Sequence, residues 1–308
     1  MNITVQLIDN QDAFGRPIGE LLRIIEIVDS TDLNDEIIID LSRCRFSNPF
    51  LLGGLVVIQK AFEKKGYNIQ FNRNFADARF AAYLEHILFP RCINPVSFAD
   101  DSYDVFFRNY RNRNFIPLTI YPNNLSPDDA RKREHFITEV TQLIINRCRL
   151  AGDIGQAMRY IISEALDNII EHSRSEFSII FAQFYPNLGY LDLIISDCGI
   201  GLLGSYQRRP DLFPHVASHT DAMQRAIDGQ STKGDELNRG FGIRTSRNML
   251  VDGLNGKYFL MSGETFYFHD RGQSRIGTTG KASFDGVFLA LRVPIGDNRN
   301  FRYTDYLE

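Results

Sequence analysis

The sequence predicts a small α/β unit followed by a larger α+β two-layer sandwich. The chain has 308 residues, and at roughly 150 residues per domain this length indicates two domains. Residues 36–72 show a strand, a helix and a second strand, which is typical of an α/β layer. The second half places long helices before hairpin-linked strands, and this order favours a sandwich over a doubly wound parallel sheet. We expect domains at 1–115 and 116–308.

The composition is that of a globular protein. Hydrophobic residues make up 44% and charged residues 23% of the chain, which argues against disorder, a collagen-like repeat or a coiled-coil rod. The net charge of −4 provides no domain-wide basic field for nucleic acid or membrane. The apolar stretch 49–58 is too short to span a bilayer, and no secretory signal is visible. The cysteines lack zinc or disulfide spacing, so we expect a cytoplasmic protein with reduced thiols at Cys44, Cys92, Cys148 and Cys198.

The first half contains one clear strand–helix–strand unit. The β-branched run 36–41 predicts a buried strand, the segment from Phe50 to Gly66 a helix, and 67–72 a second strand. Residues 100–116 alternate arginines with Asn and aromatic residues. A solvated connector between domains is favoured there over an RNA-binding stripe, because the whole chain is acidic.

The second half opens with a strand at 117–124 and a long helix capped by Ser126, with Pro127 in its first turn. A further helix is expected at 153–172. Residues 202–239 are polar and predict irregular structure. The remaining segments predict a helix and buried strands, of which the first two form a hairpin through the turn PNLG: strands 177–185 and 190–197, helix 240–251, and strands 256–263, 264–270 and 285–295.

The helix at 153–172 carries three polar residues on or beside its apolar stripe. Asn168 and His172 fall inside the stripe and Glu164 at its rim, and the spacing of four places all three in one row. Burying such groups without partners costs several kcal/mol, so the row predicts a site. A set of core side chains that hydrogen-bond one another is the alternative interpretation.

Two glycine-containing segments follow this helix. The strand 190–197 ends in Asp197, Gly199 and Gly201, where glycines permit positive φ and let the backbone approach a ligand closely. Further on, GQSTKGDELNRGFGIR forms a glycine-punctuated loop that enters a helix, and a helix N-terminus is suited to phosphate.

Taken together, residues 117–296 resemble the GHKL ATP-binding fold, also called the Bergerat fold, which is shared by histidine kinases, anti-sigma-factor serine kinases, type II topoisomerases, MutL and heat-shock chaperone ATPases. SEALDNIIEHS resembles its ExxxN box, SDCGIGL its DxGxG box and NRGFGIR its second glycine box. The preceding GQSTKG is similar to a lid segment of some sensor kinases. The string NIIEH is closest to the anti-sigma-factor kinase branch.

The resemblance implies ATP and Mg²⁺ as cofactors and a role for each matching residue. Asn168 would bind Mg²⁺ through its side-chain oxygen. Glu164 would position or deprotonate the attacking water or hydroxyl. Asp197 would accept a hydrogen bond from the adenine amino group. His172, in the same row as Glu164 and Asn168, is a further candidate for cofactor binding.

The glycines and the lid would complete the nucleotide site. Gly199 and Gly201 would let the chain pass the nucleotide, and Gly240 and Gly242, with the helix after them, would receive phosphates. Residues 202–239 would form the lid over ATP. Two of its basic residues are candidate phosphate-binding charges, although solvated surface charges would look the same in the sequence: Lys233 and Arg239.

Several positions depart from the family pattern. Asn238 stands where many members have a glycine, and Glu171 replaces the lysine of many sensor kinases. In the last strand Val287 follows Gly286, where a threonine is usual. A hydroxyl on the nucleotide side is then missing, unless Thr278 or Thr279 supplies it.

Residues 36–72 resemble a STAS domain, the fold of anti-sigma-factor antagonists. The phosphorylated serine of antagonists begins the corresponding helix, but Asn48, Pro49 and Phe50 stand at that place here, and Ser47 is out of register. We therefore expect no phosphorylation switch there. A generic α/β layer is the alternative interpretation.

Four functions remain open at this point. The first is a Mg-ATP-dependent regulatory switch with slow hydrolysis, and the second is a serine/threonine kinase of the anti-sigma-factor type. A sensor histidine kinase would need His135 as phosphoacceptor, but the residues after it lack the usual acid and paired helix. The fourth is a non-catalytic ATP-binding module. We expect ATP or ADP and a regulatory protein as partners, no nucleic acid and no membrane, and leave homodimerisation open.

Overall fold

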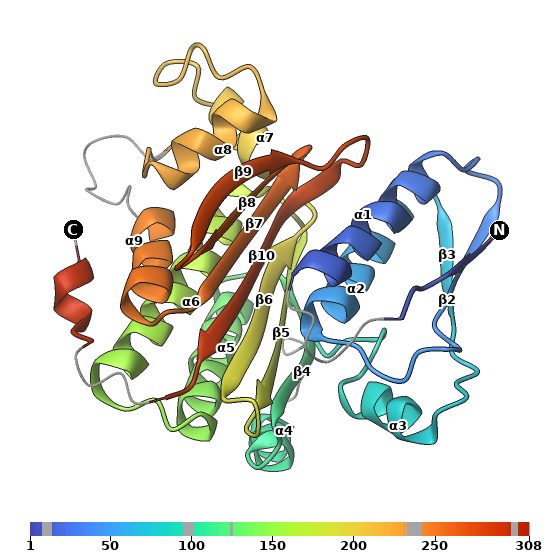
Figure 1. The fold of residues 1–308 in the computed structure, drawn as a ribbon, viewed down its shortest axis with the longest axis horizontal. Coiled ribbons are helices and arrows are strands. Elements are labelled where there is room, and N and C mark those ends of the chain that lie inside the picture. The colour runs from blue at the N-terminus through green and yellow to red at the C-terminus, as the bar shows by residue number, and fades with distance from the viewer. Residues whose placement is uncertain are drawn as a thin grey trace.

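The structure is a computed structural model, and its elements form four layers. From one side to the other these are a small sheet, two helices, a large sheet and a second set of helices (Figure 1). The description covers residues 1–7, 14–94, 102–123, 126–230, 232, 242–296 and 301–307, with the backbone alone at 102–104.

The two sheets differ in the direction of their strands. The small sheet is parallel, in the order β1-β2-β3, with strands Asn2–Thr4, Glu36–Asp40 and Asn68–Asn72. The large sheet is antiparallel throughout, in the order β4-β5-β6-β10-β7-β8-β9. Its strands are Phe115–Pro122, Phe177–Tyr185, Tyr190–Asp197, Lys257–Gly263, Thr265–Asp270, Gln273–Thr278 and Phe284–Pro294 for β4 to β10. The expected small α/β part and larger α+β part are therefore both present.

Helix α2 (Pro49–Lys64) lies between the two sheets and is apolar on nearly all sides. The side chain of Asn48 caps it by accepting a hydrogen bond from the backbone N–H of Leu51. On one side, a Cβ at Gly53 would lie 1.9 Å from Ile194 Cδ1 of β6, and on another a Cβ at Gly54 would lie 2.3 Å from Leu21 Cδ1 of α1. The close contacts mean that one continuous core joins the small unit to the large sheet.

The rest of the small unit completes this layer. Helix α1 (Gly15–Asp29) packs beside α2, and β2 points Ile37 and Ile39 toward the helices, where neither has exposed surface. Helix α3 (Ala78–His86) is capped by Asp77, whose side chain accepts hydrogen bonds from two backbone N–H groups of the first turn.

The opposite face of the large sheet is covered by α5 (Pro127–Arg147), α6 (Gly152–His172) and α9 (Gly242–Asn248). Helix α9 continues into a π-helical turn at Met249–Gly253. The predicted cap of α5 is present, because Ser126 Oγ accepts from the backbone N–H of Asp129. A short 3₁₀ turn at Tyr303–Tyr306 packs against α6.

Two predictions about irregular structure were wrong. The segment expected as a solvated connector contains helix α4 (Ser102–Tyr110), and Phe106 is buried with its ring 4.9 Å from that of Phe136. The polar stretch 202–239 contains α7 (Gly201–Gln207) and α8 (His219–Ile227). These two helices share a small apolar cluster with Val216, and such tertiary contacts override a weak local pattern.

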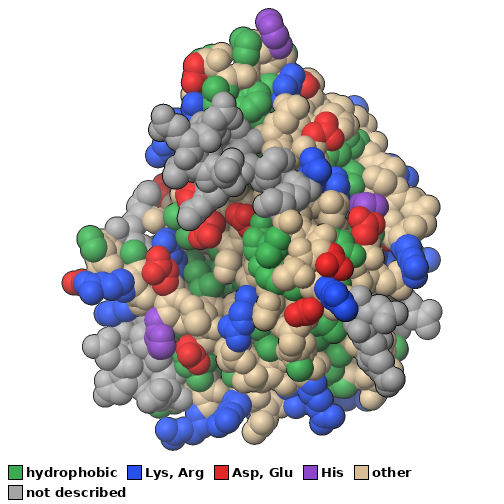
Figure 2. Space-filling view, turned by 90° about the vertical axis from the view of Figure 1, so that its left-hand side faces the viewer, with side chains coloured by type: hydrophobic (Ala, Val, Ile, Leu, Met, Phe, Trp, Pro, Cys, Tyr) green, Lys and Arg blue, Asp and Glu red, His purple; other side chains and the backbone are tan. Residues whose placement is uncertain are grey.

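Among the described helices, none combines the length and the apolar character that a membrane span requires. The four cysteines are free, and three of them are buried. Basic and acidic side chains are interspersed over the side of the molecule that carries α9 (Figure 2), so the coloured part of that face has no extended patch of one charge.

Substitution of Gly53 tests the close contact between α2 and the large sheet. Gly53→Ala places a methyl group against Ile194, and we expect overpacking to lower the free energy of unfolding by about 1–3 kcal/mol. Gly19→Ala is the matched control, because Gly19 is an exposed position of α1 and an added methyl group there would meet no other atom within 4 Å. That change should raise stability by up to about 1 kcal/mol. Urea denaturation measures the free energy of unfolding of both variants, and equal changes in the two would contradict the close packing of α2 on the large sheet.

Candidate functional site

A cavity opens between α6, the large sheet and helices α7 to α9. It encloses about 1000 Å³ of space free of atoms, open solvent at its mouth included. Strands β6, β7 and β10 supply an apolar floor, and polar side chains come from α6, α7, α9 and the ends of neighbouring elements. The floor residues are Ile195, Tyr258, Leu260, Val287 and Leu289. An apolar cavity with a few convergent polar groups is the usual form of a small-molecule site.

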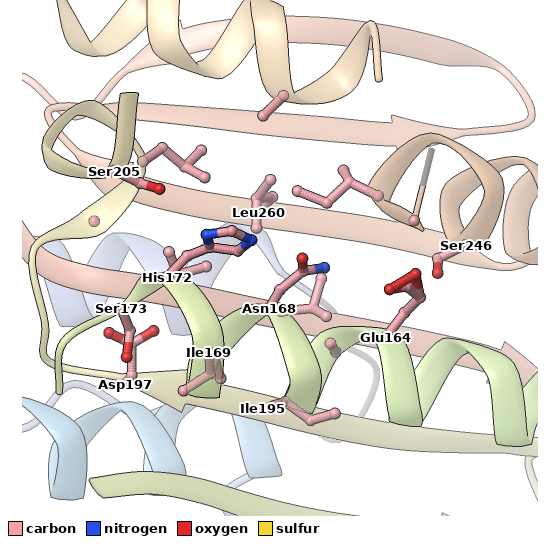
Figure 3. Close-up of a pocket in the computed structure, with 18 of the residues that line it drawn as sticks. Glu164, Asn168, Ile169, His172, Ser173, Ile195, Asp197, Ser205, Ser246 and Leu260 are labelled. Carbon is pink, nitrogen blue, oxygen red and sulfur yellow. The ribbon is translucent and has the colours of Figure 1, made fainter. Parts of the chain in front are cut away.

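The predicted row on α6 faces this cavity. Glu164, Asn168 and His172 project from the same side of the helix, one turn apart, and all three line the cavity (Figure 3). Their side chains are half-buried at the cavity, whereas helical spacing alone places Asn168 and His172 inside the apolar stripe of α6. The cavity admits them to solvent, which removes most of the desolvation cost that the core position would impose.

His172 and Glu164 stand at different ends of the row. The Nδ1 atom of His172 lies 3.2 Å from Thr232 Oγ1, and its Nε2 atom lies 3.8 Å from Glu171 Oε2. At the other end, a Cβ on Gly242 would lie 2.2 Å from Glu164 Oε2. Gly242 therefore allows the start of α9 to approach the carboxylate, and it also lines the cavity.

Asp197 ends strand β6 at the His172 end of the cavity. Its side chain has no exposed surface, and its Oδ1 atom accepts a hydrogen bond of 2.7 Å from the backbone N–H of Gly199. Its Oδ2 atom is buried and has no hydrogen-bond partner in the described part of the chain. Burial raises the pKa of Asp197 to about 7, against the opposing effect of the backbone N–H groups of Gly199 and Val287. Asp197 therefore lines the cavity with one buried acceptor that has no hydrogen bond of ordinary geometry in the described part of the chain.

The positions around Asp197 are glycines because neighbouring atoms of the protein leave no room there for a Cβ atom. A Cβ at Gly199 would lie 2.0 Å from the carbonyl oxygen of Ser173. Gly201 has a φ of +64° and a Cβ there would lie 2.6 Å from Ser262 Oγ. Of the two glycines of the DxGxG segment, only Gly201 has positive φ. Gly201 lines the cavity, whereas Gly199 acts through its N–H group on Asp197.

Two further residues at this end were missed by the sequence reasoning as parts of the site. Gly286 has a φ of +92°, and a Cβ there would lie 2.3 Å from the carbonyl oxygen of Asp197. It falls where the pairing of β10 with β7 shifts register, as in a β-bulge. Ser262 Oγ donates to the carbonyl of Gly286 at 2.8 Å and accepts from the N–H of Leu202 at 2.9 Å. A glycine inside a strand pattern was the available signal for the bulge.

The hydroxyl expected from Thr278 or Thr279 does not reach the cavity. Thr279 Oγ1 donates to the carbonyl of Ala282, and neither threonine is among the residues that line the cavity. The described part of the chain has no group of three His, Cys, Asp or Glu side chains suited to a metal ion. A divalent ion beside Asn168 would accordingly need oxygen ligands from the bound molecule.

The structure brings six predicted residues to one cavity: Glu164, Asn168, His172, Asp197, Gly201 and Gly242. Three others lie outside the described residues, namely Lys233, Arg239 and Gly240, as does Asn238. His135 is exposed on α5, which packs directly on α6 and β4.

No protein-family model matches the sequence, and a search of curated proteins finds no match.

The raised pKa of Asp197 predicts a pH-dependent stability. An unfolded Asp has a pKa of about 3.9, so between about pH 4 and pH 7 the folded protein retains a proton that the unfolded chain has lost. The free energy of unfolding contributed by this group is full below pH 4 and falls by about 1.4 kcal/mol per pH unit up to pH 7. Asp197→Asn cannot titrate but keeps an oxygen for Gly199. Denaturation at pH 5 and pH 7 should show a smaller loss of stability in the variant, and identical losses would contradict the assignment.

Proposed function

We propose that the cavity binds Mg-ATP and that the protein is a slow ATPase of the GHKL type, acting as a nucleotide-dependent switch on a protein partner. The observation that carries this proposal is the Oδ2 atom of Asp197, which lies at one end of an apolar cavity and has no hydrogen-bond partner among the described residues. A buried carboxylate oxygen at a cavity wall suits an N–H donor of a ligand, and the exocyclic amine of adenine is such a donor. The apolar floor would stack against the base.

The fold supports this proposal. An antiparallel sheet with α6 and α9 on one face, and a cavity between them, is the arrangement expected of a GHKL two-layer sandwich. The ExxxN residues, the DxGxG aspartate and a glycine of the second box come from separate parts of the chain and line one cavity. Helical periodicity accounts for the row on α6, but it does not account for three segments far apart in the sequence lining the same cavity.

The row on α6 supplies the polar chemistry beyond the base. Asn168, in the middle of the row, would ligate Mg²⁺ through its amide oxygen, and the phosphates would provide further oxygens. Mg²⁺, when bound, neutralises phosphate charge during phosphoryl transfer. Glu164, one turn further along, would accept a proton from a water that attacks the terminal phosphorus, while the bond from that phosphorus to the ADP oxygen breaks.

The small unit supports a switch with its STAS-like part docked in cis. Helix α2 is buried against β5, β6 and β10 of the large sheet, so the small unit covers the face opposite the cavity. Ser47 is 2% exposed and Asn48 is 1% exposed. Of the two, only Ser47 carries a hydroxyl, and its burial keeps it from a kinase, so phosphorylation of the in-chain STAS-like helix is not part of this proposal.

Substitutions on α6 separate nucleotide binding from turnover. We expect Asn168→Ala to abolish Mg²⁺-dependent binding of ATP, because the variant loses the metal ligand. Glu164→Ala should retain binding and lose at least about 100-fold in phosphate release, the usual contribution of general base catalysis. Ser163→Ala, on the exposed side of the same helix, should change neither. Calorimetry with and without EDTA and a phosphate-release assay measure both. Normal Mg-ATP binding by Asn168→Ala would overturn the site assignment.

Transfer of label from γ-labelled ATP distinguishes the proposed hydrolysis from phosphotransfer. The protein is incubated with Mg²⁺ and labelled ATP, alone and with cell lysate. We expect label in free phosphate, at a rate that does not depend on lysate proteins. Label on serine of a second protein would instead establish a kinase of the anti-sigma-factor type. Label on His135 would establish a histidine kinase, and ATP that stays bound and intact would establish a non-catalytic module.

A further inference from the structure

Helix α9 carries two neighbouring hydroxyl groups that are buried. Thr245 is 2% exposed and Ser246 is 5% exposed. The hydroxyl oxygen of Ser246 has no hydrogen-bond partner in the described part of the chain, whereas Thr245 interacts with the side chain of Tyr160. A serine inside a helix commonly donates to the carbonyl four residues earlier, but Ser246 does not. A buried hydroxyl without a partner costs free energy, so Ser246 calls for an explanation.

Only one of the two hydroxyl groups belongs to the cavity. Ser246 lines it together with Ile243, one turn earlier on the same face of α9, whereas Thr245 does not line it. Figure 3 shows Ser246 beside Glu164, at the opposite end of the row from Asp197. The polar groups therefore follow one another along the cavity, from Asp197 past Asn168 to Glu164 and Ser246.

This order has a consequence for a nucleotide that lies along the cavity. With the base at Asp197 and the metal ion at Asn168, the terminal phosphate reaches the end formed by Glu164 and Ser246. Glu164 is an acceptor and, when ionised, repels a phosphate oxygen. A hydroxyl donor at the same end offsets this repulsion, and Ser246 is a buried donor in that place.

We propose that Ser246 donates a hydrogen bond to an oxygen of the terminal phosphate of bound ATP and so distinguishes ATP from ADP. This inference rests on the proposed function, since it needs a nucleotide in the cavity. The hydroxyl keeps its proton, and no bond other than the hydrogen bond forms. Ser246 would thereby report the state of the nucleotide to α9, which packs on α6 and α8.

Affinity for two nucleotides tests this assignment. Calorimetry with Mg²⁺ and either ADP or adenylyl imidodiphosphate, a non-hydrolysable ATP analogue, is applied to the full chain and to Ser246→Ala and Thr245→Ala. We expect Ser246→Ala to lower the affinity for the analogue about tenfold, the effect of one hydrogen bond to a charged group, and to leave the affinity for ADP unchanged. Thr245→Ala is the matched control, and it should change neither affinity, because its hydroxyl does not face the cavity.

The outcomes separate this inference from the proposed function. A Ser246→Ala variant that binds ADP normally is folded at the site, so an unchanged affinity for the analogue would overturn the role of Ser246. An equal loss for both nucleotides would also overturn it, since the effect would then be one of folding or base binding. If the unsubstituted protein binds neither nucleotide, the proposed function itself fails, and the inference fails with it.

Discussion

Four backbone segments meet around the carboxyl group of Asp197, and the geometry of the cavity depends on this meeting. The end of β6, the turn after α6, the start of α7 and the bulge of β10 approach so closely that side chains are excluded at Gly199, Gly201 and Gly286. The same approach withdraws Asp197 from water and leaves one of its oxygens without a donor in the described part of the chain. A costly arrangement of this kind is expected where a ligand completes it.

The small unit reaches the same region from the other side of the sheet. Lys65 follows the last residue of α2, and its Nζ atom lies 2.6 Å from Oδ2 of Asp285, the residue before Gly286. Helix α2 also packs its glycines against β6 and α1. The part of β10 around Asp285 and Gly286 therefore contacts both the large sheet and the small unit. A change in the packing of the small unit can alter the packing of the large sheet at this place.

The sequence predicted those features that depend on local periodicity. The row on α6 follows from helical spacing, and Asp197 was recognised because it ends a strand before two glycines. Features that depend on contacts between distant segments were missed. Helices α4 and α7 are short, and α4 is held by contact of Phe106 with a ring on α5. For α8, the Ser218 cap was an available local signal.

Other parts of the site could not be predicted from one sequence. The apolar run of α2 indicates burial on all sides of the helix. It does not indicate that the large sheet is one of the two surfaces against which the helix packs. Ser246 sits in an ordinary helical sequence, and its role emerges only once α9 is placed beside Glu164. The bulge at Gly286 likewise depends on its pairing with β7, which brings Ser262 to its carbonyl group.

A crystal structure with Mg²⁺ and a non-hydrolysable ATP analogue is the sharpest test of nucleotide binding in this cavity. We expect adenine against the apolar floor, with its exocyclic amine within hydrogen-bond distance of the Oδ2 atom of Asp197 and the metal ion beside Asn168. An analogue bound elsewhere, or a cavity that stays empty while water satisfies Asp197, would contradict this expectation.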